Sequence, residues 1–345
     1  MKKGIFFPAF ILVVILVMAI LFLFPKKINE SEVIDSCTDG TRDNSCSSIK
    51  PYYCLNTTLI ERASICECPE GLTKDDDKCF SEFHTNPKNI TLNYIIDGEE
   101  NKIDFIVYEG LTDYLSKIPR SISYDSDKQP SRADFKFKKI NEENQRNFLL
   151  PLVVEIENLA VQKEDQMKIA VSIVQNIEWG YSNKTVRFAD TRLSYSRYPY
   201  EILYDSQGLC GEKSELLAFL LRELGYDVVI FYNKKENHES VGIKCPLKYS
   251  WSGSGYCFIE TSGPSIISDT SISYVGGIKI TSNPQIINIS NGFALGGKFE
   301  EYEDAETLSK IRGKVSDNGR INFFDKWRLD KLNEKYGLVD EYNAA

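Results

Sequence analysis

The chain has 345 residues and a formal net charge of −9, with 42% hydrophobic and 26% charged residues. The acidic balance disfavours a nucleic-acid-binding protein, for which a basic face would be expected. The composition is that of a globular protein without a long disordered tract, and the length exceeds that of one typical domain. We therefore expect two or three folded units and no nucleic acid partner.

An apolar segment predicts a membrane anchor within residues 1–27. Residues 5–24 form a run of 20 uncharged, almost wholly apolar residues with two lysines on either side. A helix of this length reaches about 30 Å, the thickness of one bilayer core. A cleaved secretory signal is the alternative, but residues 22–26 (Phe-Leu-Phe-Pro-Lys) contain no small-residue cleavage site. We expect a single, uncleaved span.

Residues 28–80 predict a linker and a disulfide-rich module. An even cluster of cysteines next to a membrane span is typical of a disulfide framework in an oxidising compartment. A zinc site is the competing interpretation, but no histidine lies inside the cluster. We therefore predict that the bulk of the protein lies outside the cytoplasm. The six cysteines are Cys37, Cys46, Cys54, Cys66, Cys68 and Cys79.

The cysteine spacing, which includes the run Cys66-Glu-Cys68-Pro-Glu-Gly, resembles that of epidermal-growth-factor-like modules. Spacing alone allows fifteen connectivities for six cysteines. The resemblance implies the pairs 37–54, 46–66 and 68–79. A recognition module and a disulfide-stapled spacer without a binding role both remain open.

Residues 81–139 predict a small β-containing subdomain. Apolar and polar residues alternate over 90–96 and 102–108, on either side of the turn dipeptide Asp97-Gly98. This pattern indicates a β-hairpin. Residues 111–118 favour a short helix, and residues 125–132 favour a loop. No catalytic motif is visible in this stretch.

A domain from residue 140 to 300 begins with two predicted helices, over 144–157 and 165–177, in which apolar residues recur at helical spacing. A third helix follows Cys210 and ends before Gly225, which is a natural helix stop. Three strands are then expected, near 226–232, 238–244 and 255–261. His238 begins the second strand and Glu260 lies at the end of the third.

Cys210, His238 and Glu260 are the candidate catalytic residues. Unpaired N–H groups and the helix dipole at the first turn of a helix favour a thiolate there. His238 would act as general base and acid, and Glu260 would orient its ring. The backbone N–H of Cys210, together with the Gln207 side chain, would stabilise an oxyanion. An inert core thiol, a turn histidine and a solvated carboxylate are the alternatives, and sequence does not fix the strand register.

Residues 200–232, with His238 and the run Tyr256-Cys-Phe-Ile-Glu-Thr, resemble the transglutaminase-like domains of the papain-like cysteine enzyme superfamily. The resemblance covers about residues 140–270. It implies an α+β fold in which a cysteine-bearing helix packs on an antiparallel sheet, and a Cys–His–Asp triad that acts on amides. Two departures matter: the acid is Glu260, and Gly-Glu-Lys follows Cys210 where tissue-type transglutaminases have Trp. Cross-linking of glutamine to lysine is therefore not the default expectation.

Two further cysteines, Cys245 and Cys257, could cross-link the last hairpin or remain free. If they pair, Cys210 is the odd thiol, which in an exported protein is a candidate reactive group.

Residues 301–345 predict a C-terminal helical extension. No calcium-binding motif is visible, and we expect no cofactor and no metal.

Together these observations predict a membrane-anchored, extracytoplasmic thiol enzyme acting on amide bonds of a protein or peptide substrate in the cell envelope. Peptidase, deamidase and acyl transferase activities remain open. The rival hypothesis is a binding or adhesion scaffold with a catalytically inactive transglutaminase-like fold. The two differ in the reactivity of Cys210.

Overall fold

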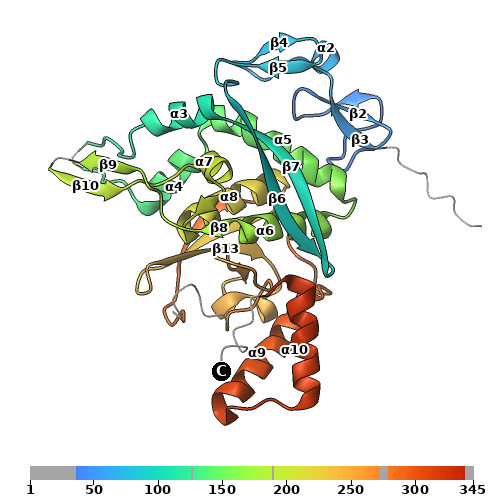
Figure 1. The fold of residues 1–345 in the computed structure, drawn as a ribbon, viewed down its shortest axis with the longest axis vertical. Helices are drawn as coiled ribbons and strands as arrows, with labels where there is room; N and C mark the ends of the chain where they lie inside the picture. The colour runs from blue at the N-terminus through green and yellow to red at the C-terminus, as the bar shows by residue number, and fades with distance from the viewer. Residues whose placement is uncertain (1–35, 126, 189, 272–278, 339–345) are drawn as a thin grey trace, which may run out of the picture. The chain divides into compact units, whose positions relative to one another are not determined.

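The computed structural model describes residues 36–125, 127–188, 190–271 and 279–338, which combine helices with antiparallel sheets (Figure 1). The predicted α+β class is therefore confirmed. Within these ranges no helix is long and apolar enough to cross a membrane. The predicted anchor, residues 5–24, lies outside the described residues.

The disulfide-rich module comprises a three-stranded antiparallel sheet, a short helix and a small hairpin. Its disulfides join Cys37 to Cys54, Cys46 to Cys66 and Cys68 to Cys79, the pairs that the growth-factor-like spacing implies. The predicted disulfide framework is confirmed. The elements are β1 (Ser45–Cys46), β2 (Tyr52–Leu55), β3 (Thr58–Glu61), α2 (Ala63–Cys66), β4 (Thr73–Asp75) and β5 (Lys78–Phe80).

This module packs directly on helix α5 (Glu143–Leu159). The backbone N–H and C=O of Leu59 both bond to the side-chain amide of Asn158, at 2.9 and 3.0 Å. Val154 of α5 also joins the small apolar cluster around the Cys37–Cys54 disulfide. The module is thus held against the helices by paired hydrogen bonds and shared burial.

The predicted hairpin is formed by β6 (Pro87–Ile96) and β7 (Glu99–Tyr108). Its turn residues Asp97 and Gly98 have φ of 52° and 82°, as the Asp-Gly dipeptide allows. One face of the hairpin is buried in the main hydrophobic core, and β6 runs along α6 (Lys163–Asn176) (Figure 1). The hairpin and the helices therefore share one core.

Helix α3 (Glu109–Lys117) occupies the predicted short helical segment. Helix α4 (Arg132–Ile140) follows the loop, and sequence reading did not identify it. The chain then continues through α5, α6, β8 (Glu178–Trp179), the hairpin of β9 (Thr185–Phe188) and β10 (Thr191–Ser194), α7 (Pro199–Asp205), β11 (Gln207–Gly208) and α8 (Cys210–Glu223).

A four-stranded antiparallel sheet of order β14-β13-β12-β15 packs against α8. The strands are β12 (Val228–Asn233), β13 (His238–Lys244), β14 (Tyr256–Ile259) and β15 (Gln285–Ser290). Short 3₁₀ turns at Leu247–Tyr249 and Trp251–Gly253 connect β13 to β14. A disulfide joins Cys245, the residue after β13, to Cys257 of β14, so of the two alternatives for these cysteines the structure has the cross-link.

Helices α9 (Glu301–Asn318) and α10 (Phe323–Tyr336) form a C-terminal hairpin (Figure 1). They bury a small apolar cluster of their own that includes Ile266. This cluster connects them to the segment that follows β14.

Candidate active site

Cys210 is the first residue of α8, and a capping interaction fixes the turn that carries it. The Glu212 carboxylate accepts the backbone N–H of Leu209 at 3.0 Å and that of Arg197 at 2.8 Å. Residues 216–221 are apolar and buried, and Gly225, with φ of 93°, ends the helix. All nine cysteines lie in the described residues, and Cys210, which is half-buried, is the free one.

His238 and Glu260 lie on neighbouring strands in contact with one another. The register of β13 and β14 pairs Val241 with Ile259. Glu260, the next residue, therefore lies diagonally opposite His238 on the neighbouring strand. His238 Nε2 lies 2.8 Å from Oε2 of Glu260. The second carboxylate oxygen of Glu260 accepts the backbone N–H groups of Thr261 and Ser262, at 2.9 and 2.8 Å. The carboxylate is therefore held at both oxygens.

Cys210 forms a side-chain hydrogen bond with the same imidazole. Burial alone would lower the pKa of His238, but hydrogen bonds with Cys210 and Glu260 and their negative charges raise it to about 10. The structure thus brings the three predicted catalytic residues together, with the imidazole between the thiol and the carboxylate.

The start of α8 meets the start of β13 through two consecutive residue pairs. While Cys210 contacts His238, a side chain at Gly211 would place its Cβ 2.4 Å from Oε2 of Glu239. Only glycine allows this approach without a shift. Glu239 is buried, and Arg132 and Lys136 of α4 bind it, Arg132 at 2.6 Å. The charges of α4 thereby fix the strand end that carries His238.

Gln207, the predicted oxyanion donor, lies in β11, which pairs with β8. Its side-chain oxygen accepts a hydrogen bond from Arg197 at 3.3 Å, and its side-chain nitrogen packs against Gly180. These contacts align the strand that leads into Cys210. The oxyanion role stays a prediction.

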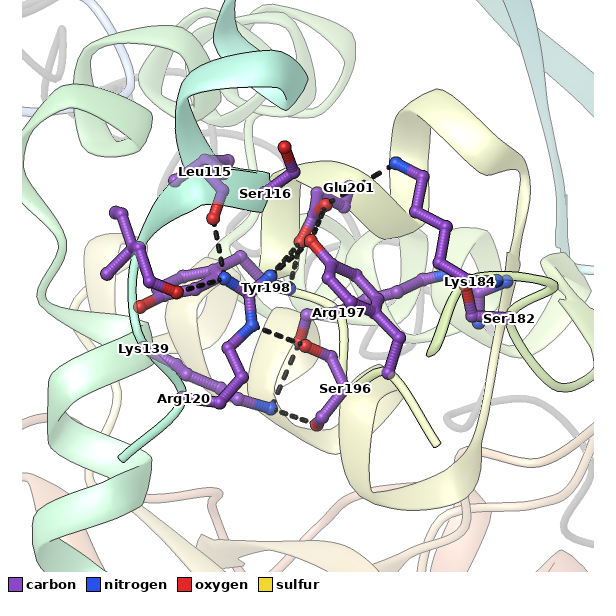
Figure 2. Close-up of polar contacts among 12 residues, drawn as sticks. Leu115, Ser116, Arg120, Lys139, Ser182, Lys184, Ser196, Arg197, Tyr198 and Glu201 are labelled. Atoms are coloured by element: carbon purple, nitrogen blue, oxygen red, sulfur yellow. Dashed lines mark hydrogen bonds and ion pairs between the residues drawn. The ribbon is translucent and has the colours of Figure 1, made fainter. Parts of the chain in front are cut away.

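Two arginines, Arg197, which is buried, and Arg120, which is partly buried, hold the segment between β8 and α8 in place. Arg197 binds Asp205 at 2.7 Å and Glu212 at 3.1 Å, and Arg120 binds Glu201 at 2.9 Å. Figure 2 shows Arg120 also donating to the carbonyl of Ser196, at 3.0 Å, while Lys139 reaches the Ser196 hydroxyl and the Arg197 carbonyl. This network ties the segment before Cys210 to α3 and α4.

Sequence reading missed three side chains that surround the triad. Lys213 is fully buried one helical turn after Cys210. Gln175 of α6 donates to the backbone carbonyl of Glu260 at 2.9 Å. Thr261 donates to the carbonyl of Cys210 at 3.2 Å. Of these three residues, the sequence pointed only to Lys213, because three positions after Cys210 it lies on the same face of the helix as the thiol.

Within the described ranges, no group of three or more His, Cys, Asp and Glu side chains is placed to hold a metal ion. No protein-family model matches the chain, and no curated protein matches it at a significant level.

Proposed function

We propose that the protein is a membrane-anchored, extracytoplasmic thiol enzyme that acts on amide bonds of proteins or peptides in the cell envelope. The observation that carries the proposal is the imidazole of His238, which bonds to Glu260 at 2.8 Å and to the free thiol of Cys210. The resemblance to transglutaminase-like domains supports the same reaction class.

The proposed chemistry starts from an ion pair of the Cys210 thiolate and the His238 imidazolium. Because Nε2 is bound to Glu260, Nδ1 is the ring nitrogen left for the thiol. The thiolate attacks the amide carbonyl, and the C–N bond breaks as His238 gives its proton to the leaving amine or ammonia. A thioester remains on Cys210.

The second half-reaction regenerates the thiolate. His238 takes a proton from water or from an acceptor amine, which attacks the thioester and displaces the sulfur. Water gives a carboxylic acid, and an amine gives a new amide. Glu260 keeps the imidazole oriented and stabilises its charged form in both steps. Peptidase, deamidase and transferase activities all follow this scheme.

The test is the pH dependence of iodoacetamide labelling of Cys210, followed by intact mass on the non-reduced chain. The other eight cysteines are in disulfides, so a single adduct reports one site. We expect the wild type to label at pH 6 at least about tenfold faster than His238→Ala, because the imidazolium stabilises the thiolate.

The enzyme hypothesis is wrong if the wild type labels with the pH profile of a free cysteine, whose pKa is about 8.5, and if His238→Ala does not change that profile. In that case the binding-scaffold hypothesis takes its place. His84→Ala is the matched control, because His84 contacts Phe148 and Tyr108 rather than the thiol.

A further inference from the structure

Behind the candidate triad, two buried polar side chains hold the segment 260–265 against the helices. We propose that Lys213 and Gln175 are positioning residues, which fix the backbone on which Glu260 depends and, through the Lys213 ammonium, balance the charge of the site. The inference rests on the proposed function of Cys210, His238 and Glu260. It concerns residues that do not touch the reacting atoms.

The orientation of the Glu260 carboxylate depends on the backbone that follows it. One oxygen accepts the N–H groups of Thr261 and Ser262, and the other meets His238. A rotation of these two peptide units would release the first oxygen and turn the second away from the imidazole. Whatever holds segment 260–265 therefore holds the His238–Glu260 bond.

Gln175 clamps both ends of this segment. Its side-chain nitrogen donates to the carbonyl of Glu260 at 2.9 Å and to the hydroxyl of Ser265 at 3.0 Å. Its side-chain oxygen accepts the backbone N–H of Ser265 at 3.3 Å. The amide is buried, so these bonds are protected from exchange with water.

Lys213 clamps the middle of the segment. Its ammonium donates to the carbonyl of Ser262 at 3.3 Å and, at the end of α6, to those of Ile177 at 2.6 Å and Gln175 at 3.3 Å. An ammonium has three N–H donors, and three carbonyl oxygens accept them here. The side chain is 0% exposed. This geometry favours the charged form of Lys213, because a neutral amine has two N–H donors and would leave one of the three carbonyls without a hydrogen bond.

The same ammonium has a place in the charge balance. Burial lowers the pKa of Lys213 to about 8, and the negative charges of Glu260 and Cys210 act in the opposite direction. With Lys213 charged, the thiolate and Glu260 carboxylate are matched by two cations, His238 and Lys213. Without it the buried site would carry one uncompensated negative charge, which disfavours the thiolate.

The experiment measures the midpoint pH of Cys210 alkylation in the full chain carrying Lys213→Gln or Gln175→Met. Lys213→Gln keeps hydrogen-bond donors and removes the charge, and we expect its midpoint to move upward by about one pH unit. Gln175→Met removes the clamp without changing charge, and we expect slower labelling at pH 6. Lys168→Met is the control for the loss of a lysine charge, because Lys168 on α6 pairs with Glu301, at 2.8 Å, and not with a residue of the candidate site.

A purely structural role would lower the unfolding free energy and leave the midpoint in place. If folded Lys213→Gln keeps the wild-type midpoint, the charge-balancing role is wrong. If Lys213→Gln does not fold, an unchanged labelling rate in Gln175→Met overturns the inference. Wild-type protein that labels as an ordinary thiol would instead overturn the proposed function, so the two failures are distinguishable.

Discussion

His84 and His238, the two histidines of the chain, lie in regions that act on an imidazole in opposite ways. His84 packs against the ring of Phe148, with centroids 4.3 Å apart, and against Tyr108 at 4.8 Å. Burial there lowers its pKa. His238 is also buried, yet its bonds to Cys210 and Glu260 and their negative charges raise its pKa to about 10. Burial by itself therefore does not decide protonation; the charged partners do.

The partners of each imidazole therefore distinguish a packing histidine from a candidate catalytic one. An imidazole among aromatic rings contributes packing, and its neutral form is the stable one. An imidazole between a thiol and a carboxylate is kept protonated near neutral pH, which is the state that a thiolate needs as a partner. Variants that remove the charged partners should make His238 behave like His84.

Glu260→Gln should have the largest effect, because it removes a charge and keeps the side-chain volume. We expect the pKa of His238 to fall and labelling of Cys210 at pH 6 to slow by about tenfold or more. Labelling kinetics and histidine titration check this. Unchanged values for His238 would mean that Glu260 does not support the imidazolium.

The difference in unfolding free energy between wild type and Glu260→Gln should depend on pH. A raised folded-state pKa means that His238 stabilises the fold fully below its ordinary pKa of about 6.5. This contribution is lost as the pH rises toward about 10. The gap between the unfolding free energies of wild type and Glu260→Gln should therefore narrow across this interval in urea titrations.

Removing the Cys245–Cys257 disulfide should have a smaller effect on the site and a clear effect on stability. The bond joins the residue after β13, which begins at His238, to β14, which Glu260 follows, and it closes a loop with a sequence separation of 12. Chain-entropy arguments assign about 3 kcal/mol to a loop near this size. We expect the double variant Cys245→Ser, Cys257→Ser to lose stability of this order in urea unfolding.

The same double variant should affect the two histidines differently. The His238 signal should broaden or shift as the β13–β14 pair loosens, while the His84 signal should stay in place. Equal changes at both histidines would show that the disulfide supports the fold generally rather than this pair of strands.

Much of the fold could be predicted because local signals agreed with tertiary structure. Asp97-Gly98 marked the hairpin turn, Gly225 marked the end of α8, and β13 begins at His238 as predicted. Helix α4 was missed because its buried face includes Lys136, whose ammonium donates a hydrogen bond to the Glu215 carboxylate at 2.7 Å. A charged buried face breaks the apolar periodicity on which helix prediction depends.

The site was predictable as a set of residue types and not as a geometry. A one-residue change of register between β13 and β14 would point Glu260 to the other face of the sheet, and sequence does not fix that register. Lys213 and Gln175 escaped notice because their partners are backbone carbonyls far away in the chain. Such contacts leave no pattern in a single sequence.

Side-chain ¹⁵N NMR of the two histidines at pH 8 tests directly whether His238 is protonated in the folded protein. We predict one imidazolium, assigned to His238 by its loss in His238→Ala, and one neutral ring, assigned to His84. Two neutral rings at pH 8, with His238 titrating near its ordinary pKa of about 6.5, would show that Cys210 and Glu260 do not hold the imidazole in its protonated form.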